Sequence, residues 1–200
     1  MNISAATIKQ LREQTGAGVL DCRKALEQTE GDLEKAKAWL KDKGLAQAAK
    51  KADRVAKDGL IGSYIHHNNR IAVLIEVNCE TDFVARTEGF KTLTQTLAKH
   101  IAMANPQYIK PEDIPAAHLE EVKKGFHEEA VAGGKPENVL DRIVEGKLEK
   151  YYQETCLLRQ AYVLDDKIII GDMLTQAITD LRENIVVRRF VRYELGGESL

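Results

Sequence analysis

Several features that mark particular protein classes are scarce or missing in this sequence. Its 200 residues hold three cysteines and four prolines, and Cys22, Cys79 and Cys156 are too scattered for a disulfide framework or a CxxC metal site. No uninterrupted apolar run approaches the roughly 20 residues that a membrane-spanning helix needs. The start, MNISAATIKQ, has neither the apolar region of a signal peptide nor the arginine-rich character of a transit peptide. We therefore expect reduced thiols, no membrane role, and a bacterial-type cytoplasm or an organelle matrix as the location.

Catalytic motifs are missing as well. There is no GxGxxG and no glycine-rich GK[ST] loop, so the chain itself should not bind a nucleotide. His66 and His67 are adjacent on a predicted strand and should point to opposite faces, which disfavours a shared metal, and His127-Glu128-Glu129 lacks the second histidine of a zinc protease. A dyad of Cys79 with the distant His100 is the remaining candidate, but lone thiols mostly pack inside proteins. We predict that the chain is not an enzyme and holds no metal or cofactor.

The charge is balanced rather than basic. The chain has 29 Lys and Arg against 31 Asp and Glu, a net charge of −2, whereas a protein held mainly by phosphate contacts needs an excess of cations on one face. Direct nucleic-acid binding is therefore not expected. The densest basic cluster is Lys50, Lys51, Arg54 and Lys57, which is either a solvated surface or a docking patch for a partner.

The first part of the chain has a helical pattern with breaks. Ser4 is placed to cap a first helix, and Gly16 and Gly18 interrupt the pattern before it resumes at residues 19–28. Asp32 caps a third helix, which Gly44 should end. We predict a three-helix module at residues 1–45 and a linker at 46–58. Because such a small core is only marginally stable, a module of this size usually binds something.

From residue 59 onward the pattern predicts an α+β core. Residues 60–65 and 70–79 alternate as two strands around Asn68-Asn69, a pair that tolerates the positive φ of a hairpin turn. A helix follows Thr81 or Asp82 and stops at Asn105-Pro106, and a helical hairpin is expected at about 116–154. Further elements are a strand near 159–164, a helix near 173–181 and a last strand at 185–195, which should pair with the first hairpin because a stable sheet needs at least about three strands.

Five stretches of the sequence, in the same order, resemble one family. They are LREQTGAGVLDCRKAL at 11–26, NCETDFVART at 78–87, HIAMANPQYIKPEDI at 100–114, GKPENVLDRIVEGKLEKYYQE at 134–154 and ENIVVRRFVRYELG at 183–196. The family is translation elongation factor Ts, and the likeness covers almost the whole chain. It implies a guanine-nucleotide exchange factor that binds the GDP form of elongation factor Tu and promotes loss of magnesium and GDP. It also implies a ubiquitin-associated-like bundle, a core sheet and a protruding helical arm.

The resemblance assigns roles to individual residues. It implies that the segment that dislocates magnesium consists of Thr81, Asp82, Phe83 and Val84. Residues expected against the GTPase are Arg12, Val19, Leu20 and His100, to which we add Lys51 from the basic cluster. Four of these residues have a plainer interpretation: Phe83, Val19 and Leu20 as core residues, and His100 as a hydrogen-bonded histidine on a helix surface.

The sequence departs from longer family members in two ways. It has one hairpin unit, residues 59–84, where they have a duplicated half-core, and it stops at Leu200 without their extra C-terminal helix. An uncovered apolar sheet face predicts a homodimer through the core sheet. Two other classes of function stay open: a general binding module that recognises ubiquitin-like or ribosomal partners, and a thiol enzyme that uses Cys79.

Overall fold

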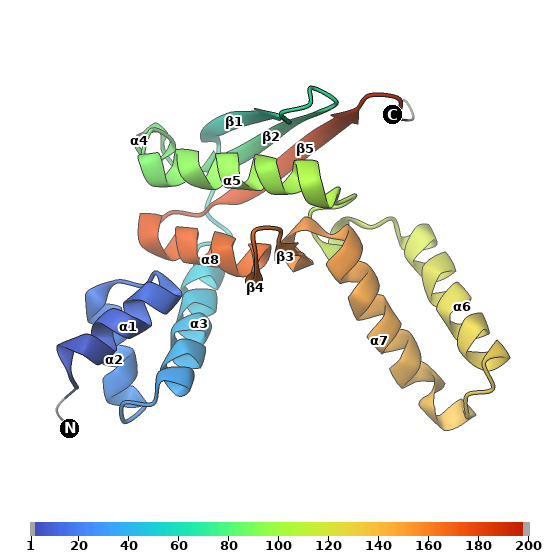
Figure 1. Ribbon diagram of the computed structural model, residues 1–200, viewed down its shortest axis with the longest axis horizontal. Helices are drawn as coiled ribbons and strands as arrows, with labels where there is room; N and C mark the ends of the chain where they lie inside the picture. Colours follow the sequence, from blue (N-terminus) through green and yellow to red (C-terminus); the bar gives the residue numbers. More distant parts are fainter. Residues whose placement is uncertain (1–2, 198–200) are drawn as a thin grey trace. The chain divides into compact units, whose positions relative to one another are not determined.

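The computed structural model describes residues 3–197 (Figure 1), and the chain forms two compact units. The first runs up to Gly62 and adds Ile75–Thr96 and Asp172–Phe190. The second holds Ser63–Leu74, Leu97–Gly171 and the residues from Val191 onward. Helices, a small antiparallel sheet and an N-terminal three-helix bundle confirm the predicted α+β fold.

The N-terminal bundle of the first unit consists of α1 (Ala5–Thr15), α2 (Val19–Gln28) and α3 (Leu33–Ala49). The Ser4 side chain accepts a hydrogen bond from the Thr7 amide at 3.1 Å, and Asp32 accepts one from the Lys35 amide at 3.0 Å. Gly16 ends α1 with a φ of 69°, a left-handed conformation that glycine adopts at little cost. The small core consists of Leu11, Ala17, Cys22, Ala25, Leu26 and Ala36.

The prediction that Gly44 ends the third helix is wrong. Gly44 lies inside α3, which continues through the alanine-rich turn to Ala49. A Cβ at Gly44 would lie 3.4 Å from Cγ2 of Thr175 on α8 (Ile170–Leu181). Glycine at this point permits a close helix approach, and the alanines that follow have the highest helix propensity of all residues.

The sheet has the strand order β1-β2-β5, formed by β1 (Asp58–Ile65), β2 (Ile71–Cys79) and β5 (Val186–Glu194). Asn69 in the connecting turn has a φ of 55°, as the hairpin prediction requires. The last strand pairs with β2, which confirms that it returns to the hairpin. Gly62 allows close packing on the sheet, because a Cβ there would lie 2.5 Å from Cγ2 of Thr94.

The first unit also contains three further helical segments. They are the short α4 (Asp82–Ala85), the first half of α5 (Glu88–Ala104) and nearly all of α8. The buried apolar residues of this part are Ile75, Val77, Cys79, Ala85, Phe90, Leu93, Leu174, Ile178, Ile185 and Val187. These side chains form a second and larger core in the unit, separate in sequence from that of the bundle.

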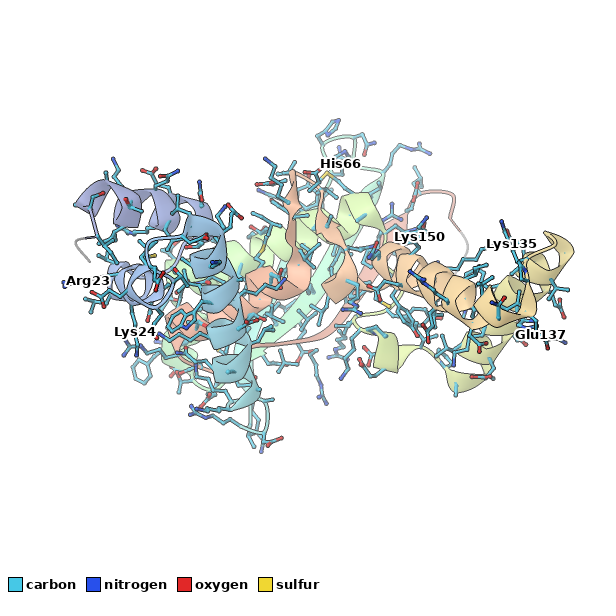
Figure 2. All side chains as sticks on the ribbon, turned by 90° about the horizontal axis from the view of Figure 1, so that it is seen from below. Arg23, Lys24, His66, Lys135, Glu137 and Lys150 are labelled. Carbon is cyan, nitrogen blue, oxygen red and sulfur yellow. The ribbon has the colours of Figure 1, made fainter. Side chains whose placement is uncertain are left out.

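In the second unit, α6 (Ala116–Ala132) and α7 (Glu137–Thr155) form the predicted helical hairpin. Nε2 of His118 and Oη of Tyr151 are 3.0 Å apart, so an aromatic and a polar contact join the two helices. Figure 2 shows Lys135 and Glu137 at the turn between them, where Gly134 has a φ of 69°.

The segment after the helical hairpin differs from the prediction. The strand expected near 159–164 is present as the shorter β3 (Ala161–Tyr162). It follows a short 3-10 helix, Leu157–Arg159, and pairs with a strand that was not predicted, β4 (Asp165–Ile169). The sequence DDKII of β4 begins with two acidic residues, which hid its strand character because aspartate is depleted in strands. A further 3-10 turn, Pro111–Asp113, precedes α6. None of the helices within residues 3–197 combines the length and apolar character needed to cross a membrane.

Candidate functional site

The candidate site is the corner where β2 gives way to α4, residues 79–85, all within the first unit. The strand ends at Cys79, and Thr81 then adopts an extended conformation and caps α4. Oγ1 of Thr81 accepts a hydrogen bond from the Val84 amide at 3.4 Å. The chain therefore changes direction within two residues, which leaves little freedom for the residues of α4.

Glu183 holds the corner from the other side. Its carboxylate accepts hydrogen bonds from the amides of Glu80 at 3.0 Å and Thr81 at 3.1 Å, and from Oγ1 of Thr81 at 2.6 Å. Glu80 in turn accepts a hydrogen bond from the Asn184 amide at 2.6 Å. Hydrogen bonds to an ionised group are about twice as strong as neutral ones, so this exchange of contacts between the two segments stiffens the corner.

Phe83 projects from this support into solvent. Its side chain is 79% exposed, whereas Ala85, two residues later, is buried. Asp82 pairs with Arg86 at 2.7 Å on the helix surface, and Val84 is half-buried. The structure thus excludes the interpretation of Phe83 as a core residue of the described chain.

Arg12, Val19 and Leu20, which we call the docking face, lie on the bundle. Leu20 is 81% exposed, Val19 is 50% exposed, and Arg12 is exposed near the end of α1. The bundle core is instead filled by the opposite side of α2, from Cys22, Ala25 and Leu26. The interpretation of Val19 and Leu20 as packing residues inside the bundle is therefore wrong.

Lys51 follows the end of α3 and is not a freely solvated lysine. Its Nζ donates a hydrogen bond to the Ile178 carbonyl at 3.0 Å. Partial burial, and then the neighbouring Arg54, lower the pKa of Lys51. The side chain is thus held against α8 and contributes its charge from a fixed position.

His100 is the candidate whose surroundings differ most from expectation. Both interpretations of the sequence place it at a surface, but its side chain is fully buried in the second unit. Nε2 lies 2.9 Å from Oε1 of Gln160, and Nδ1 accepts a hydrogen bond from the Val163 amide at 3.4 Å. Burial lowers the pKa of His100, although the Gln160 hydrogen bond opposes this. The imidazole therefore fixes the segment that carries β3 and has no exposed surface for a partner in this conformation.

Two further groups bear on possible chemistry. Burial, followed by the Glu183 carboxylate, raises the pKa of the Cys79 thiol to about 11. It is protonated at neutral pH and is a poor nucleophile, which disfavours a thiol enzyme.

The expected orientation of His66 and His67 is wrong. β1 ends at Ile65, so both histidines lie in the turn rather than on a strand, and their ring centroids are 4.1 Å apart. Oη of Tyr64 is 3.1 Å from Nδ1 of His66. Within residues 3–197, no group of three or more His, Cys, Asp or Glu side chains is arranged to hold a metal ion.

Glu183 and Glu80 are the site residues that sequence reasoning missed. Both belong to stretches that carry the family resemblance, at 78–87 and 183–196, but each is an ordinary acidic residue in sequence. Neither residue carries a local signal, because their hydrogen bonds join two segments that lie about a hundred residues apart in the chain.

Comparison with known proteins gives a consistent result. The family model described as elongation factor TS matches residues 24–198. Elongation factor Ts of a Thermoanaerobacter species is 55% identical over 194 residues, which cover 97% of this chain and 95% of that protein. Elongation factor Ts of Fervidobacterium nodosum is 52% identical over 196 residues, which cover 98% of this chain and all of that protein. With an exposed Phe83 in its NCETDFVART stretch and a match along nearly its full length, this chain belongs to the elongation factor Ts family.

Proposed function

We propose that this protein is a guanine-nucleotide exchange factor for elongation factor Tu, which binds the GDP form and the nucleotide-free form. The observation that carries the proposal is the exposed Phe83 on a corner whose backbone amides are held by Glu183. Family membership supplies the partner. In this proposal, residues 1–45 dock, residues 46–58 connect, and the core from residue 59 onward carries the segment that acts on the GTPase.

The proposed mechanism involves no covalent step. If the factor weakens the binding of GDP to the GTPase, GDP must weaken the binding of the factor by the same ratio. Only contacts that favour the empty or distorted GTPase over its GDP form shift this equilibrium. We assign those contacts to Thr81, Asp82, Phe83 and Val84, with the Phe83 ring displacing the partner's helices near the magnesium site.

A rigid support is needed for this role. A ring that pushes on a neighbouring protein experiences an equal opposing force, so a flexible segment would yield instead of the partner. The hydrogen bonds of Glu183 and the burial of Ala85 resist such yielding. Asp82, paired with Arg86 beside the ring, supplies negative charge near the partner's magnesium.

The docking face and Lys51 are proposed to hold the partner without distorting it. Exposed apolar side chains such as Leu20 gain free energy on burial in a complex, and Lys51 offers a positive charge. His100 is proposed to act from inside the chain, by fixing the segment of Gln160 and Val163 rather than by direct contact.

A homodimer through the core sheet is the second part of the proposal. β1 leaves Ile61 72% exposed and Ile65 64% exposed, and Leu74 on β2 is also exposed. Exposed apolar patches mark interaction surfaces, and symmetric pairing of two sheets would cover these side chains. Sedimentation at micromolar concentration tests it: a monomer overturns the dimer, and Ile61→Lys should dissociate it.

Release of labelled GDP from elongation factor Tu, followed by stopped flow with and without this protein, tests the exchange activity. The release rate should rise with the concentration of the protein and then saturate. An unchanged rate contradicts the proposal. In that case, failure to recover elongation factor Tu in a pull-down would favour the alternative of a general protein-binding module.

A further inference from the structure

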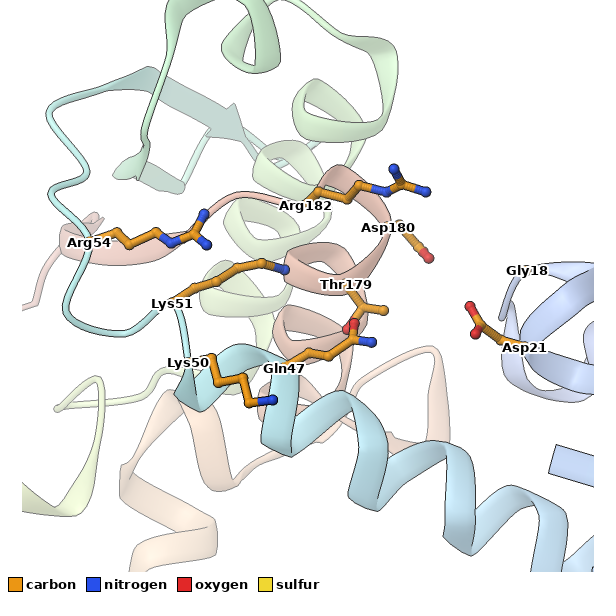
Figure 3. Close-up of a pocket in the computed structure, with 9 residues that line it drawn as sticks. All are labelled: Gly18, Asp21, Gln47, Lys50, Lys51, Arg54, Thr179, Asp180 and Arg182. Atoms are coloured by element: carbon orange, nitrogen blue, oxygen red, sulfur yellow. The ribbon is translucent and has the colours of Figure 1, made fainter. Parts of the chain in front are cut away.

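A hollow of about 720 Å³ lies in the first unit between the ends of three helices, and we call it the basic hollow (Figure 3). Its lining consists of Gly18, Asp21, Gln47, Lys50, Lys51, Arg54, Thr179, Asp180 and Arg182. Figure 3 shows the basic side chains coming from the end of α3, from the segment after it and from the end of α8. Gly18 and Asp21 come from α2. The volume falls within the range of roughly 300 to 1,000 Å³ typical of small-ligand sites.

The positive charges of the basic hollow are only partly compensated. Among the described residues, neither Lys50 nor Arg182 has an ion pair. Lys51 donates to a carbonyl, and Arg54 reaches Glu80 only at 3.4 Å. The pKa of Lys51 is lowered by burial and further by Arg54 and Arg182, with Glu80 opposing. The cations are thus close enough to repel one another.

Of the two carboxylates in the lining, Asp21 is neutralised by a cation outside the hollow, whereas Asp180 keeps its charge and accepts a hydrogen bond from a neutral amide. Asp21 forms an ion pair with Lys43, and Oδ1 of Asp180 accepts a hydrogen bond from Nε2 of Gln176 at 2.9 Å. Asp21 also lies on the α2 side, away from the basic side chains of α3 and α8. An anion placed against Lys50, Lys51 and Arg182 would therefore meet cations that form no ion pair with a carboxylate among the described residues.

Arg182 occupies an unusual backbone conformation for an arginine. Its φ is 61°, at the end of α8, in the left-handed region where a residue with a Cβ is less stable than glycine. A glycine at this position would end the helix with less strain. Arg182 therefore lines the basic hollow although its backbone conformation is one that glycine adopts more easily than arginine.

We propose that the basic hollow binds a small soluble anion with several linked phosphoryl groups, such as tripolyphosphate or a nucleoside triphosphate, through side-chain cations and without the glycine-rich nucleotide-binding loops on whose absence the sequence prediction rested. Guanidinium and ammonium groups are the side chains that recognise phosphate oxygens, the first by paired hydrogen bonds and the second as a point charge. Cations from separate segments suit an extended anion better than a single phosphate. Gln47 and Thr179 supply neutral hydrogen-bonding groups for the rest of the ligand.

This inference concerns the isolated chain and does not rest on the proposed exchange activity. It also differs from non-specific phosphate binding, because the net charge of −2 gives the whole protein no general attraction for anions. Binding should nonetheless weaken with added salt, since the site is open to solvent and ions screen exposed charges beyond about 10 Å at 0.1 M.

Isothermal titration calorimetry of the whole protein with tripolyphosphate, at constant ionic strength and without divalent cations, tests the proposal. We expect saturable binding at one site per chain. Arg182→Gln and Lys50→Gln should each weaken binding about tenfold, the cost of one charge-assisted hydrogen bond. Arg182→Gly should weaken it equally while raising the melting temperature, because glycine relieves the backbone at that position; this excludes misfolding as the cause of lost binding.

Two matched controls remove the same charge outside the basic hollow. Arg188→Gln on β5 and Lys57→Gln, both absent from the lining, should bind tripolyphosphate as the unmodified protein does. Equal loss in the controls, or no loss in Arg182→Gly, overturns the proposal, as does the absence of binding at millimolar tripolyphosphate.

Other ligands identify the chemistry that the site prefers. Tighter binding of ATP than of tripolyphosphate assigns the site to nucleotides, and the reverse assigns it to free polyphosphate; both support the proposal. Orthophosphate that binds as tightly as tripolyphosphate contradicts a site for linked phosphoryl groups. An oligonucleotide that binds more tightly than either through Arg182 would show that the hollow serves a nucleic acid and would also overturn it.

Discussion

The corner and the docking face both expose apolar side chains, but the structure supports them differently. At the corner, Phe83 stands on a helix of four residues, tied by Glu183 to the end of another segment of the same unit. On the docking face, Leu20 lies in the first turn of α2, whose N-cap Gly18 makes no side-chain capping hydrogen bond. One apolar surface is therefore held by hydrogen bonds from a distant segment, and the other lies on a three-helix bundle with a small core.

This difference suggests a division of work between the two surfaces. A contact that binds all states of a partner equally raises affinity and leaves the equilibrium between those states unchanged. A contact that favours one state must resist deformation in order to impose it. The braced surface fits the second task and the bundle surface fits the first, so a variant of each should change a different kinetic parameter.

The largest effect is expected from Phe83→Ala. Loss of the ring should lower the maximal stimulated rate of GDP release about a hundredfold, which equals roughly 2.7 kcal/mol at 1.36 kcal/mol per factor of ten. The concentration for half-maximal stimulation should change little, because the docking face is intact. Stopped-flow titrations measure both parameters. If the variant retains the full maximal rate, the ring has no such role.

Removal of the brace should give the next largest effect. Glu183→Gln keeps the shape of the side chain but cannot accept three hydrogen bonds as an anion, so we expect a loss of about 2 kcal/mol in the free energy of unfolding. The maximal exchange rate should fall with it, since Phe83 is then held less firmly. Urea denaturation and stopped flow provide the two readouts. Glu137→Gln, an exposed glutamate at the start of α7, is the control and should change neither.

Leu20→Ala should have a smaller and different effect. Its side chain is 81% exposed, so folding stability should be unchanged, while the half-maximal concentration for exchange should rise about fivefold from lost burial in the complex. The maximal rate should stay constant. Leu164→Ala, another exposed leucine, serves as the control. A fall in the maximal rate would place Leu20 in the same functional class as Phe83.

The smallest predicted effect concerns pH and His100. In the folded protein the pKa of His100 is lowered from the ordinary value of 6.5. As the pH falls, the imidazole is therefore protonated in the unfolded chain before it is protonated in the folded protein. The contribution of His100 to stability is therefore complete above about pH 6.5 and decreases as the pH is lowered through that value. Denaturation at a series of pH values should show this slope, and His100→Gln should flatten it. The exposed His127→Gln should leave the slope unchanged; a slope that persists in His100→Gln would assign it to another group.

Local patterns were sufficient for most of the secondary structure. Asn69 marks its turn because few residues accept positive φ, and Asp32 marks a helix start because its side chain accepts a backbone amide. Such signals act over a few residues, so they are readable without the rest of the chain. Gly44 misled the prediction because its role depends on Thr175, far away in sequence.

The site was predictable only in part for the same reason. The stretch NCETDFVART identifies the candidate segment, and strand and cap signals place Phe83 at a turn into a helix. Whether the Phe83 ring faces solvent depends on which other side chains fill the core. Those side chains come from distant parts of the chain, so the residues next to Phe83 in the sequence do not reveal it. The exposure of Phe83 and the burial of His100 were both decided by packing.

Sequence alone established the family, the order of helices and strands, and the residues that deserve attention, since these rest on local preferences and on the order of motifs along the chain. Tertiary structure decided the rest. Glu183 meets Thr81 across about a hundred residues, and Arg182 meets Lys51 around one hollow only when α3 and α8 pack together. The physical reason is that hydrogen bonds, burial and electrostatic repulsion depend on distance in space, which a linear pattern does not specify.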